Sequence, residues 1–204
     1  MVSKGQGEPV SQVEAETGKQ VSEKQRVREL VELAQAGDRE ALEELYLIHF
    51  DRIFGYLHVT VGNRHDAEDL TTQTFLRMLE SIGKFRWGSA PFSAWLFRIA
   101  HNLAMDHFRA SRRWQPDEDV PEPLPDESTS AEARAFESIG HKSMLDLIDE
   151  LSTEQQQVLT LKFVFGFSNQ EAATILGKTE GAVKSLQHRA LATLNKKLGS
   201  RTGT

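Results

Sequence analysis

The 204-residue sequence predicts an all-α protein made of two small helical domains joined by an acidic, proline-rich linker. Apolar residues recur at helical spacing through both halves of the chain, and no stretch alternates convincingly at the two-residue period of a strand. Glycine, asparagine, aspartate and serine interrupt this pattern where helices would begin and end. The composition also changes sharply near the middle of the chain, which separates the two halves into domains.

The first domain is predicted at residues 25–113. It follows an N-terminal extension, 1–24, which is polar, has no apolar period and is expected to be disordered. The side chain of Asp38 can cap a helix that begins directly after it. The helices of this domain are expected from Gln25 to Gly37, from Asp38 to Gly62, from about Asp66 to Gly83, and from about Phe92 to Arg113.

The linker is predicted at 114–130, where WQPDEDVPEPLPDESTS contains four prolines and no lysine or arginine. Proline fixes the backbone and like charges repel each other, so we expect an extended segment. The second domain is predicted at 131–198, followed by a short tail at 199–204.

Two helix starts are visible in the second domain. Ser152 and Gln155 have the spacing of a capping box, as do Ser168 and Glu171. The helix after Ser152 is expected to break at Gly166, with a buried face of Val158, Leu159, Leu161 and Phe163.

The stretch 168–194, SNQEAATILGKTEGAVKSLQHRALATL, predicts a helix-turn-helix. Gly177 permits a tight turn between the two helices, and Thr179 can cap the second one. The apolar face of that second helix is formed by Val183, Leu186, Ala190 and Leu194. Its opposite face is rich in hydrogen-bond donors, as in helices that enter the major groove. An αα-hairpin with a solvated polar face is the alternative for this segment taken alone.

A basic and aromatic stretch ends the first domain. Between Lys84 and Arg113 six basic residues accompany a single acid, Asp106. Aromatic residues lie among them, namely Phe85, Trp87, Phe92, Trp95, Phe97 and Phe108. Basic grooves with stacking side chains suit unpaired bases, and stacking contributes about 1–3 kcal/mol per base, enough to help hold DNA open. The alternative is that most of these rings are core, although Trp87, in a glycine-bearing loop, is expected to be exposed.

The helix before this stretch, within HDAEDLTTQTFLRML, has a different surface. Asp66, Glu68 and Asp69 fall near its N-terminus, where the helix dipole alone would favour acids. Gln73 and Arg77 extend the polar stripe by two turns. Such a surface is poorly placed for phosphate and better suited to a protein partner.

Bulk properties exclude several classes. The chain has no cysteine, no apolar run near the ~18 residues of a membrane span and no apolar segment of a secretory signal, so we expect a cytoplasmic protein without membrane insertion. The net charge of −6 argues only weakly against nucleic acid, because the charges are unevenly distributed. Its seven histidines are scattered, and we see no HExxH motif, nucleotide-binding glycine loop or nucleophile elbow. We therefore expect no enzyme, no metal and no cofactor.

These motifs together resemble the extracytoplasmic-function (ECF) group of the sigma-70 family of bacterial RNA polymerase sigma factors. HDAEDLTTQTFLRML is similar to the core-binding part of region 2, and KFRWGSAPFSAWLFRIAHNLAMDHFR to the part that melts and reads the −10 element. LSTEQQQVLTLKFVFGFSNQEAATILGKTEGAVKSLQHRALATLNKKL is similar to region 4, which reads the −35 element. The resemblance covers about residues 30–198 and leaves the N-terminal extension without a counterpart.

The resemblance implies three sets of contacts. Core RNA polymerase, through its β′ clamp helices and its β subunit, would meet a surface built from Asp66, Glu68, Asp69, Gln73, Phe75 and Arg77. The −10 element would lie against Lys84, Phe85, Arg86, Trp87, Trp95, Arg98, Asn102, Arg109, Arg112 and Arg113, with a flipped base in the loop 84–91. The −35 DNA would contact Thr179, Glu180, Lys184, Ser185, Gln187, His188 and Arg189. The resemblance also implies an anti-sigma protein as a regulatory partner, and a linker that threads toward the polymerase active-site cleft.

A ligand-responsive repressor or activator is the main competing hypothesis. It explains the helix-turn-helix equally well, but it leaves the aromatic and basic stretch and the acidic helix before it without a role. Polymerase-dependent opening of promoter DNA separates the two hypotheses.

Overall fold

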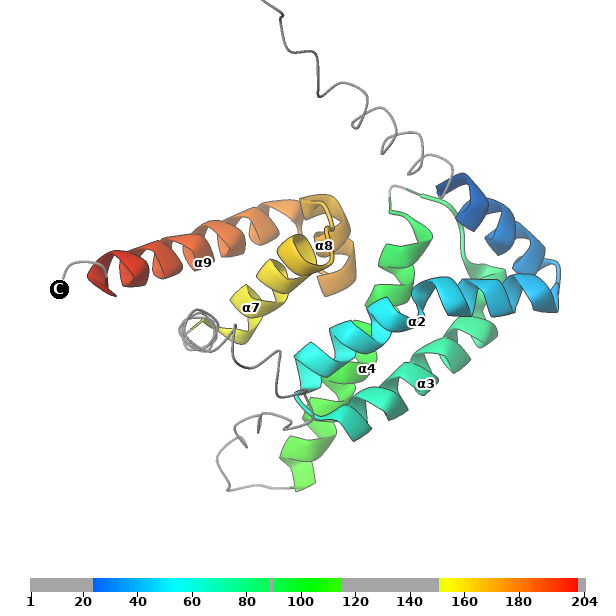
Figure 1. The fold of residues 1–204 in the computed structure, drawn as a ribbon, viewed down its shortest axis with the longest axis horizontal. Helices are drawn as coiled ribbons and strands as arrows, with labels where there is room; N and C mark the ends of the chain where they lie inside the picture. Colours follow the sequence, from blue (N-terminus) through cyan, green and yellow to red (C-terminus); the bar gives the residue numbers. More distant parts are fainter. Residues whose placement is uncertain (1–23, 89, 115–150, 202–204) are drawn as a thin grey trace, which may run out of the picture.

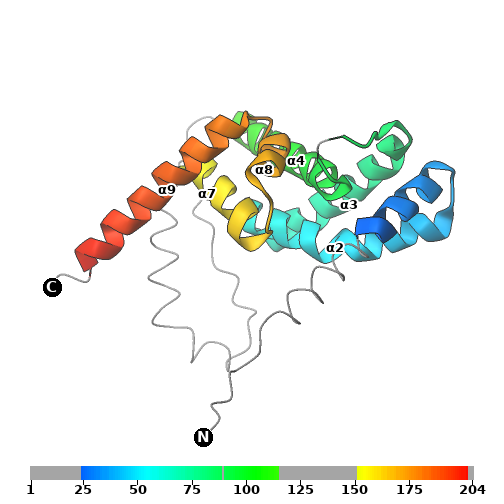
Figure 2. The ribbon, with the colours of Figure 1, turned by 90° about the horizontal axis from the view of Figure 1, so that it is seen from above.

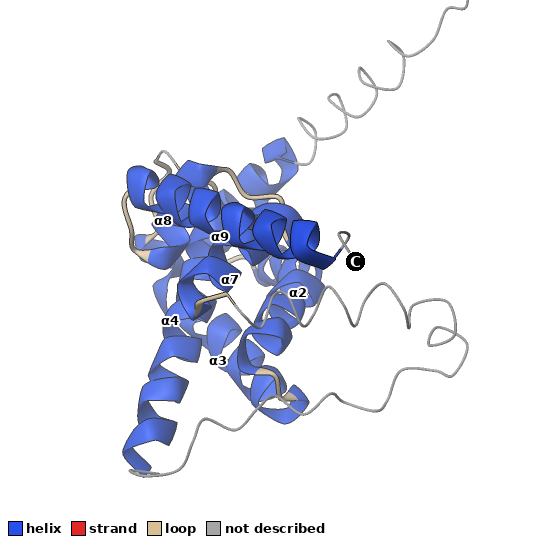
Figure 3. Ribbon diagram, turned by 90° about the vertical axis from the view of Figure 1, so that its left-hand side faces the viewer, coloured by secondary structure: helices blue, strands red, loops and turns tan. Residues whose placement is uncertain are grey.

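The computed structural model describes residues 24–88, 90–114 and 151–201, with side chains described for 24–88, 90–110 and 151–196. Within these ranges all regular structure is helical, which confirms the predicted fold class (Figure 3). The N-terminal extension through residue 23, the linker with the start of the second domain at 115–150, and the last residues of the tail lie outside them. The domain boundaries therefore stay predictions.

The described part of the first module contains four α-helices and one short 3₁₀ turn. A helix over residues 24–35 leads into the others through a turn at Ala36 and Gly37. The rest are α2 (Arg39–Val61), α3 (Arg64–Ser81), the short 3₁₀ turn η1 (Ile82–Lys84) and α4 (Phe92–Trp114). Helix α3 packs against both α2 and α4, and the three lie side by side (Figure 1).

Side-chain caps define the helix starts in this module. The Asp38 carboxylate accepts a hydrogen bond from the Ala41 amide at 3.0 Å, as the sequence predicts. Asn63 does the same for the Asp66 amide at 3.1 Å, so α3 begins at Arg64, slightly earlier than expected. Helix α2 ends at Gly62, whose φ of 70° lies in the left-handed region that glycine tolerates. The fully buried core between these helices includes Leu45, Ile53, Tyr56, Leu57, Met78, Phe92, Leu96 and Phe97.

The second module contains α7 (Thr153–Leu159), the π-helical turn η2 (Thr160–Val164), α8 (Asn169–Leu176) and α9 (Glu180–Arg201). Both predicted capping boxes are present in full, one at Ser152 and one at Ser168. Helix α9 packs against α7 and α8 and runs past them toward the C-terminus (Figures 1 and 2).

The π-helical turn overturns one sequence expectation. Phe163 was expected on the buried face, but its side chain is 63% exposed, and Leu159 is only partly buried. A turn with i→i+5 hydrogen bonds changes the rotation per residue, so the helical period that predicts the buried face no longer holds through it. Val158 and Leu161 are buried as predicted, and Phe167, beyond the turn, is buried as well.

Helices α4 and α8, from the two modules, lie side by side although they are far apart in sequence (Figure 2). Aromatic side chains also make contact between the modules. Arg52 of α2 donates a hydrogen bond of 2.8 Å to the Phe165 carbonyl and lies over the Phe97 and Phe167 rings at 5.6 and 5.5 Å. The Phe165 ring meets Tyr56 and Phe97 edge-on, with centroids 5.8 and 5.3 Å away. We call these five residues the docking cluster. Beside it, α8 packs on α4.

Candidate nucleic-acid and polymerase interfaces

Residues 85–88, which follow η1 and which we call the Trp87 loop, present the Trp87 indole against a group of packed aromatic rings. Phe85 is only 6% exposed, and its ring lies 5.1 Å from both Trp87 and Trp95 and 5.4 Å from Phe92. The buried Phe85 ring therefore supports its neighbours and has no free face for a base. Trp87 is 36% exposed and Trp95 is partly buried, so the indole of Trp87 is the accessible ring of this loop.

The basic residues near Trp87 are exposed but not all are uncommitted. Lys84 and Arg86 are both exposed. The Arg86 guanidinium donates to the carbonyl oxygens of Gly83 at 3.0 Å and Phe85 at 2.8 Å, so its head wraps around the loop backbone. These bonds hold the positive charge of Arg86 against the backbone of this loop.

One face of α4 continues this surface. Arg98, Asn102 and Arg109 are exposed and lie three or four residues apart with Asp106 among them, so they form a single stripe. Arg109 is paired with Asp106 at 2.6 Å. Arg112 and Arg113 lie in the last turn of α4, where the side chains are outside the described part of the chain.

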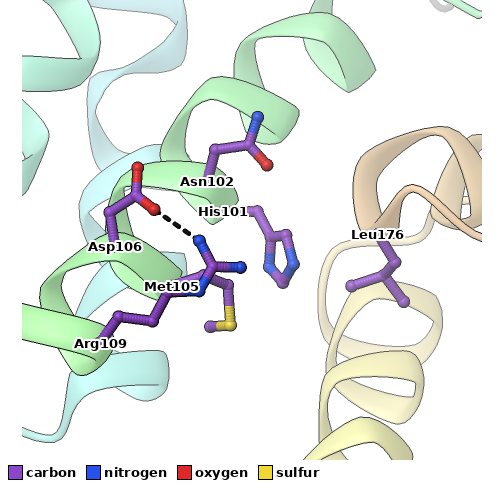
Figure 4. A pocket seen from close by; sticks show the side chains of 6 residues that line it. All are labelled: His101, Asn102, Met105, Asp106, Arg109 and Leu176. Carbon is purple, nitrogen blue, oxygen red and sulfur yellow. Dashed lines mark hydrogen bonds and ion pairs between the residues drawn. The ribbon is translucent and has the colours of Figure 1, made fainter. Parts of the chain in front are cut away.

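A cavity of about 370 Å³ lies where this stripe meets the second module. Figure 4 shows Leu176 of α8 across the cavity from side chains of α4. Its other lining residues are His101, Asn102, Met105, Asp106 and Arg109. Part of the predicted −10 surface therefore faces α8 in this conformation.

The electrostatics of this junction keep His101 neutral. Burial, together with the positive charges of Lys178 and Arg109, lowers the pKa of His101 to about 4. His101 is hydrogen-bonded through Nδ1 to the Tyr56 hydroxyl at 2.9 Å. Burial raises the pKa of Tyr56, so this hydroxyl keeps its proton.

The second module contains the predicted helix-turn-helix. Gly177, with φ 62°, turns the chain between α8 and α9, and the Thr179 hydroxyl accepts a 3.2 Å hydrogen bond from the Ala182 amide. The apolar face of α9 is inside, with Val183, Leu186 and Ala190 buried and Leu194 partly buried. Of the seven predicted DNA contacts, Gln187 is partly buried, while the exposed ones are Thr179, Glu180, Lys184, Ser185, His188 and Arg189. Glu180 pairs with Lys184 at 2.7 Å on this face.

The predicted polymerase surface is largely exposed on α3. Glu68, Asp69, Gln73 and Arg77 are exposed and Asp66 is half-buried. Asp66 lies 3.6 Å from His107 of α4, which ties the start of α3 to that helix. Phe75 is only 5% exposed, so it can support this surface from below but cannot be its contact face.

Two groups of residues were missed from sequence. Leu76 and Leu79, 53% and 49% exposed, lie next to the polar stripe of α3 and add apolar area to it. Arg28 and Gln35, from the helix over 24–35, contact the Trp87 loop. The apolar period of both helices is visible in the sequence. The exposure of the two leucines and the contacts of Arg28 and Gln35 with a distant loop depend on how the helices pack, which the period does not give.

The fold and these surfaces define a two-module nucleic-acid-binding protein, with a helix-turn-helix in one module and an aromatic, basic loop in the other. Residues 45–114 match the family model described as Sigma-70 region 2, and residues 141–194 match that of Sigma-70, region 4. The chain belongs to the ECF group of the sigma-70 family of RNA polymerase sigma factors, which is a family of transcription initiation factors and not of enzymes.

Curated relatives agree with this assignment. The ECF RNA polymerase sigma factor BldN of Streptomyces coelicolor is 42% identical over 85% of this chain and 66% of its own length. The sigma-H factor of Pseudomonas aeruginosa is 30% identical over 84% of this chain and 93% of its own. SigD of Mycobacterium tuberculosis is 33% identical, covering 82% and 81%. The chain thus spans slightly less than two thirds of the BldN relative but nearly all of the sigma-H relative.

Solved structures share the fold. The structure of CnrH in complex with the cytosolic domain of CnrY superimposes with a TM-score of 0.63, at 24% identity, over 86% of this chain and 98% of that one. RpoE in complex with the anti-sigma factor NepR from Bartonella quintana gives a TM-score of 0.60 at 23% identity, over 77% and 96%. Among the described helices of the present chain, none is long and apolar enough to cross a membrane. The described residues also contain no group of three or more metal-ligating side chains.

Proposed function

We propose that this chain binds core RNA polymerase through α3, reads −35 DNA with α9, and uses the Trp87 loop and α4 to recognise and open the −10 element. The single observation that carries the proposal is the Trp87 loop. Its accessible indole packs against the buried Phe85 ring, and Lys84 and Arg86 are adjacent in sequence. A duplex-binding repressor needs no such platform, whereas unpaired bases stack on one. The proposal puts the chain in the cytoplasm, where polymerase and promoter DNA meet.

The test is polymerase-dependent promoter opening. Core polymerase and this chain together should make thymines in the −10 element reactive to permanganate, and neither alone should do so. Trp87→Ala should lower that reactivity more than it lowers duplex binding, because it removes about 1–3 kcal/mol of stacking on a base. Binding to duplex DNA without any opening in the presence of core polymerase would identify a conventional regulator instead.

The polymerase surface is tested separately. Asp69→Lys reverses an exposed charge on α3 and should reduce copurification with core polymerase. Glu43→Lys makes the same reversal at an exposed position of α2 and is the matched control. Equal loss in both variants would mean that net charge, and not the α3 surface, governs the interaction.

We propose further that an anti-sigma protein regulates the chain by covering its polymerase-binding surface. The family resemblance supports this, as do the exposed Leu76 and Leu79 beside the polar stripe, which are suited to a protein partner. A partner copurified from the source organism should be displaced by excess core polymerase. A stable assembly of all three components would contradict competition for one surface.

A further inference from the structure

The Trp87 loop is held by a helix that lies upstream of the residues matched to region 2. That match begins at residue 45, whereas the helix in question covers 24–35. The side-chain amide of Gln35, which is partly buried, donates hydrogen bonds of 2.9 Å to the carbonyl oxygens of both Ile82 and Phe85. One amide group therefore fixes both ends of the 3₁₀ turn from which the loop departs.

The same helix also contacts the indole itself. The Arg28 guanidinium lies 5.4 Å from the centroid of the Trp87 ring, within cation–π range. Phe85 meets the indole edge-on at 5.1 Å and an angle of 81°. Arg28 is in turn 3.4 Å from Glu32, one helical turn further along. Trp87 is thus held between Phe85 and Arg28 and still keeps 36% of its surface accessible.

The loop has few means of ordering itself. After the three-residue turn η1, residues 85–88 have no regular secondary structure. Within the loop, the Phe85 amide donates to the Ile82 carbonyl at 3.0 Å, and the Arg86 side chain folds back on the backbone. The other described polar contacts of the loop come from Gln35. A tryptophan on a free loop would lose rotamer freedom on binding a base, and one already held in place would not.

We propose that Arg28 and Gln35 are positioning residues for promoter opening, which set the orientation of Trp87 before an unpaired base arrives. This inference rests on the proposed function of the loop. It adds a specific role for the helix over 24–35: that helix acts on the open strand through Trp87, without touching DNA itself.

Arg28→Ala is the first test. We expect a roughly two- to tenfold loss of permanganate reactivity in the −10 element, which corresponds to the ordering of one side chain at about 0.5–1.5 kcal/mol. Binding of core polymerase should be unchanged. Arg28→Lys should recover part of the loss, because an ammonium keeps the cation–π attraction but not the planar stacking of a guanidinium. Arg26→Ala is the matched control: Arg26 is on the same helix and exposed, but pairs with Glu44.

A direct structural readout keeps the test independent of polymerase. In protein labelled with ¹⁵N-tryptophan, the indole resonance of Trp87 should shift in Arg28→Ala and Gln35→Glu, and stay in place in Arg26→Ala. Gln35→Glu is nearly isosteric but cannot donate to the two carbonyl oxygens. An unmoved indole resonance in both variants would overturn the proposal.

A double-mutant cycle decides between positioning and a general effect. In a Trp87→Ala background, Arg28→Ala should cause no further loss of opening, because Arg28 acts through the indole. If the double mutant loses opening by the product of the two single-mutant fold losses, the proposal is overturned. If Trp87→Ala leaves opening intact, the proposed function of the loop fails first; if it impairs opening while Arg28→Ala does not, only the positioning role fails.

Discussion

His49 is a buried histidine with no hydrogen-bond partner for either ring nitrogen. Its side chain is 4% exposed, lies against Phe92 at 5.5 Å, and belongs to α2. Burial, together with the positive charge of nearby Arg52, lowers its pKa to about 4. Neutral imidazole is therefore the form that fits the core.

We expect His49 to make the first module sensitive to mild acid. With a pKa near 4 in the folded chain and about 6.5 in the unfolded chain, the unfolded state takes up the proton first. The contribution of neutral His49 to the free energy of unfolding is present above pH 6.5 and is lost as the pH falls toward 4. The loss between pH 7 and pH 5 is about 2 kcal/mol. His101 shifts in the same direction and adds to this loss.

Urea unfolding of His49→Leu at both pH values measures the contribution. The variant removes two unsatisfied polar atoms at similar volume, so its free energy of unfolding at pH 7 should stay within about 1 kcal/mol of the parent. The decrease in its free energy of unfolding between pH 7 and pH 5 should be about 2 kcal/mol smaller than the decrease in the parent protein. His65→Gln, at an exposed position, should keep the parent profile; the same profile in His49→Leu would rule out this residue as the source.

Arg189 gives the residue-scale prediction for the second module. It is exposed on α9, and within the described part of the chain its guanidinium makes one long hydrogen bond, of 3.4 Å, to the Ser185 carbonyl, so it is available to a phosphate. Arg189→Ala should weaken −35 binding and reduce the slope of log K against log salt by about one, with base preference unchanged. Lys196→Ala, further along the same helix, is the control, and a changed base preference would assign Arg189 to a base edge.

Sequence predicted the polar residues better than the aromatic ones. The donor-rich face of α9 and the acids of α3 follow from helical period, which needs no knowledge of the neighbouring helices. Phe85 and Trp87 differ by two positions in one loop, yet one is buried and the other accessible. The glycine-bearing loop predicts the exposure of Trp87, but the burial of Phe85 depends on packing between α3, α4 and the helix over 24–35, which no local pattern encodes.

At the scale of elements, the capping boxes are the strongest local determinants. Ser168 accepts from the Glu171 amide at 3.2 Å, and the Glu171 carboxylate accepts from the Ser168 amide at 2.7 Å. Helix α8 spans only Asn169–Leu176, so its cap is a large share of its local stability. Both boxes were readable from the sequence, because their spacing is fixed by the first turn of a helix.

We expect Ser168→Ala to lower the free energy of unfolding of the second module by about 1 kcal/mol. Duplex DNA binding should fall in step at temperatures near the unfolding midpoint, since α8 positions α9. Ser185→Ala, mid-helix and exposed, should leave stability unchanged or slightly higher, because alanine is the better helix former. Equal stability in the two variants, measured by thermal unfolding, would show that the box contributes nothing.

The π-helical turn shows where element prediction fails. Its sequence, TLKFV, has the apolar residues of an ordinary helical turn. Only the rest of the fold, which draws Phe165 and Phe167 into the first module, accounts for a widened turn at this point. A feature set by tertiary contacts cannot be read from the local period.

At the scale of the whole molecule, the docking cluster joins two modules that sequence analysis predicts as separate. Arg52 and Phe165 are 113 residues apart, and no local sequence pattern predicts the contact between them. Arg52→Ala removes the hydrogen bond and two cation–π contacts, so we expect the modules to separate and the radius of gyration in solution scattering to rise. Arg64→Ala is the matched control, because Arg64 lies over Phe54 and pairs with Glu68 within one module. An unchanged radius in Arg52→Ala would mean that other contacts suffice.

Elements named for positions −35 and −10 lie about 25 base pairs apart, or about 85 Å along B-DNA. Helices α4 and α8, which are in contact here, belong to the two modules that are proposed to read those elements. Residues 115–150 could extend to at most roughly 120 Å, so the covalent connection permits the separation. If the proposed function holds, the docking cluster opens when the chain binds a promoter, and the free energy of that opening is subtracted from the binding free energy. Under that proposal, strengthening the contacts of Arg52 should reduce binding at weak promoters before strong ones.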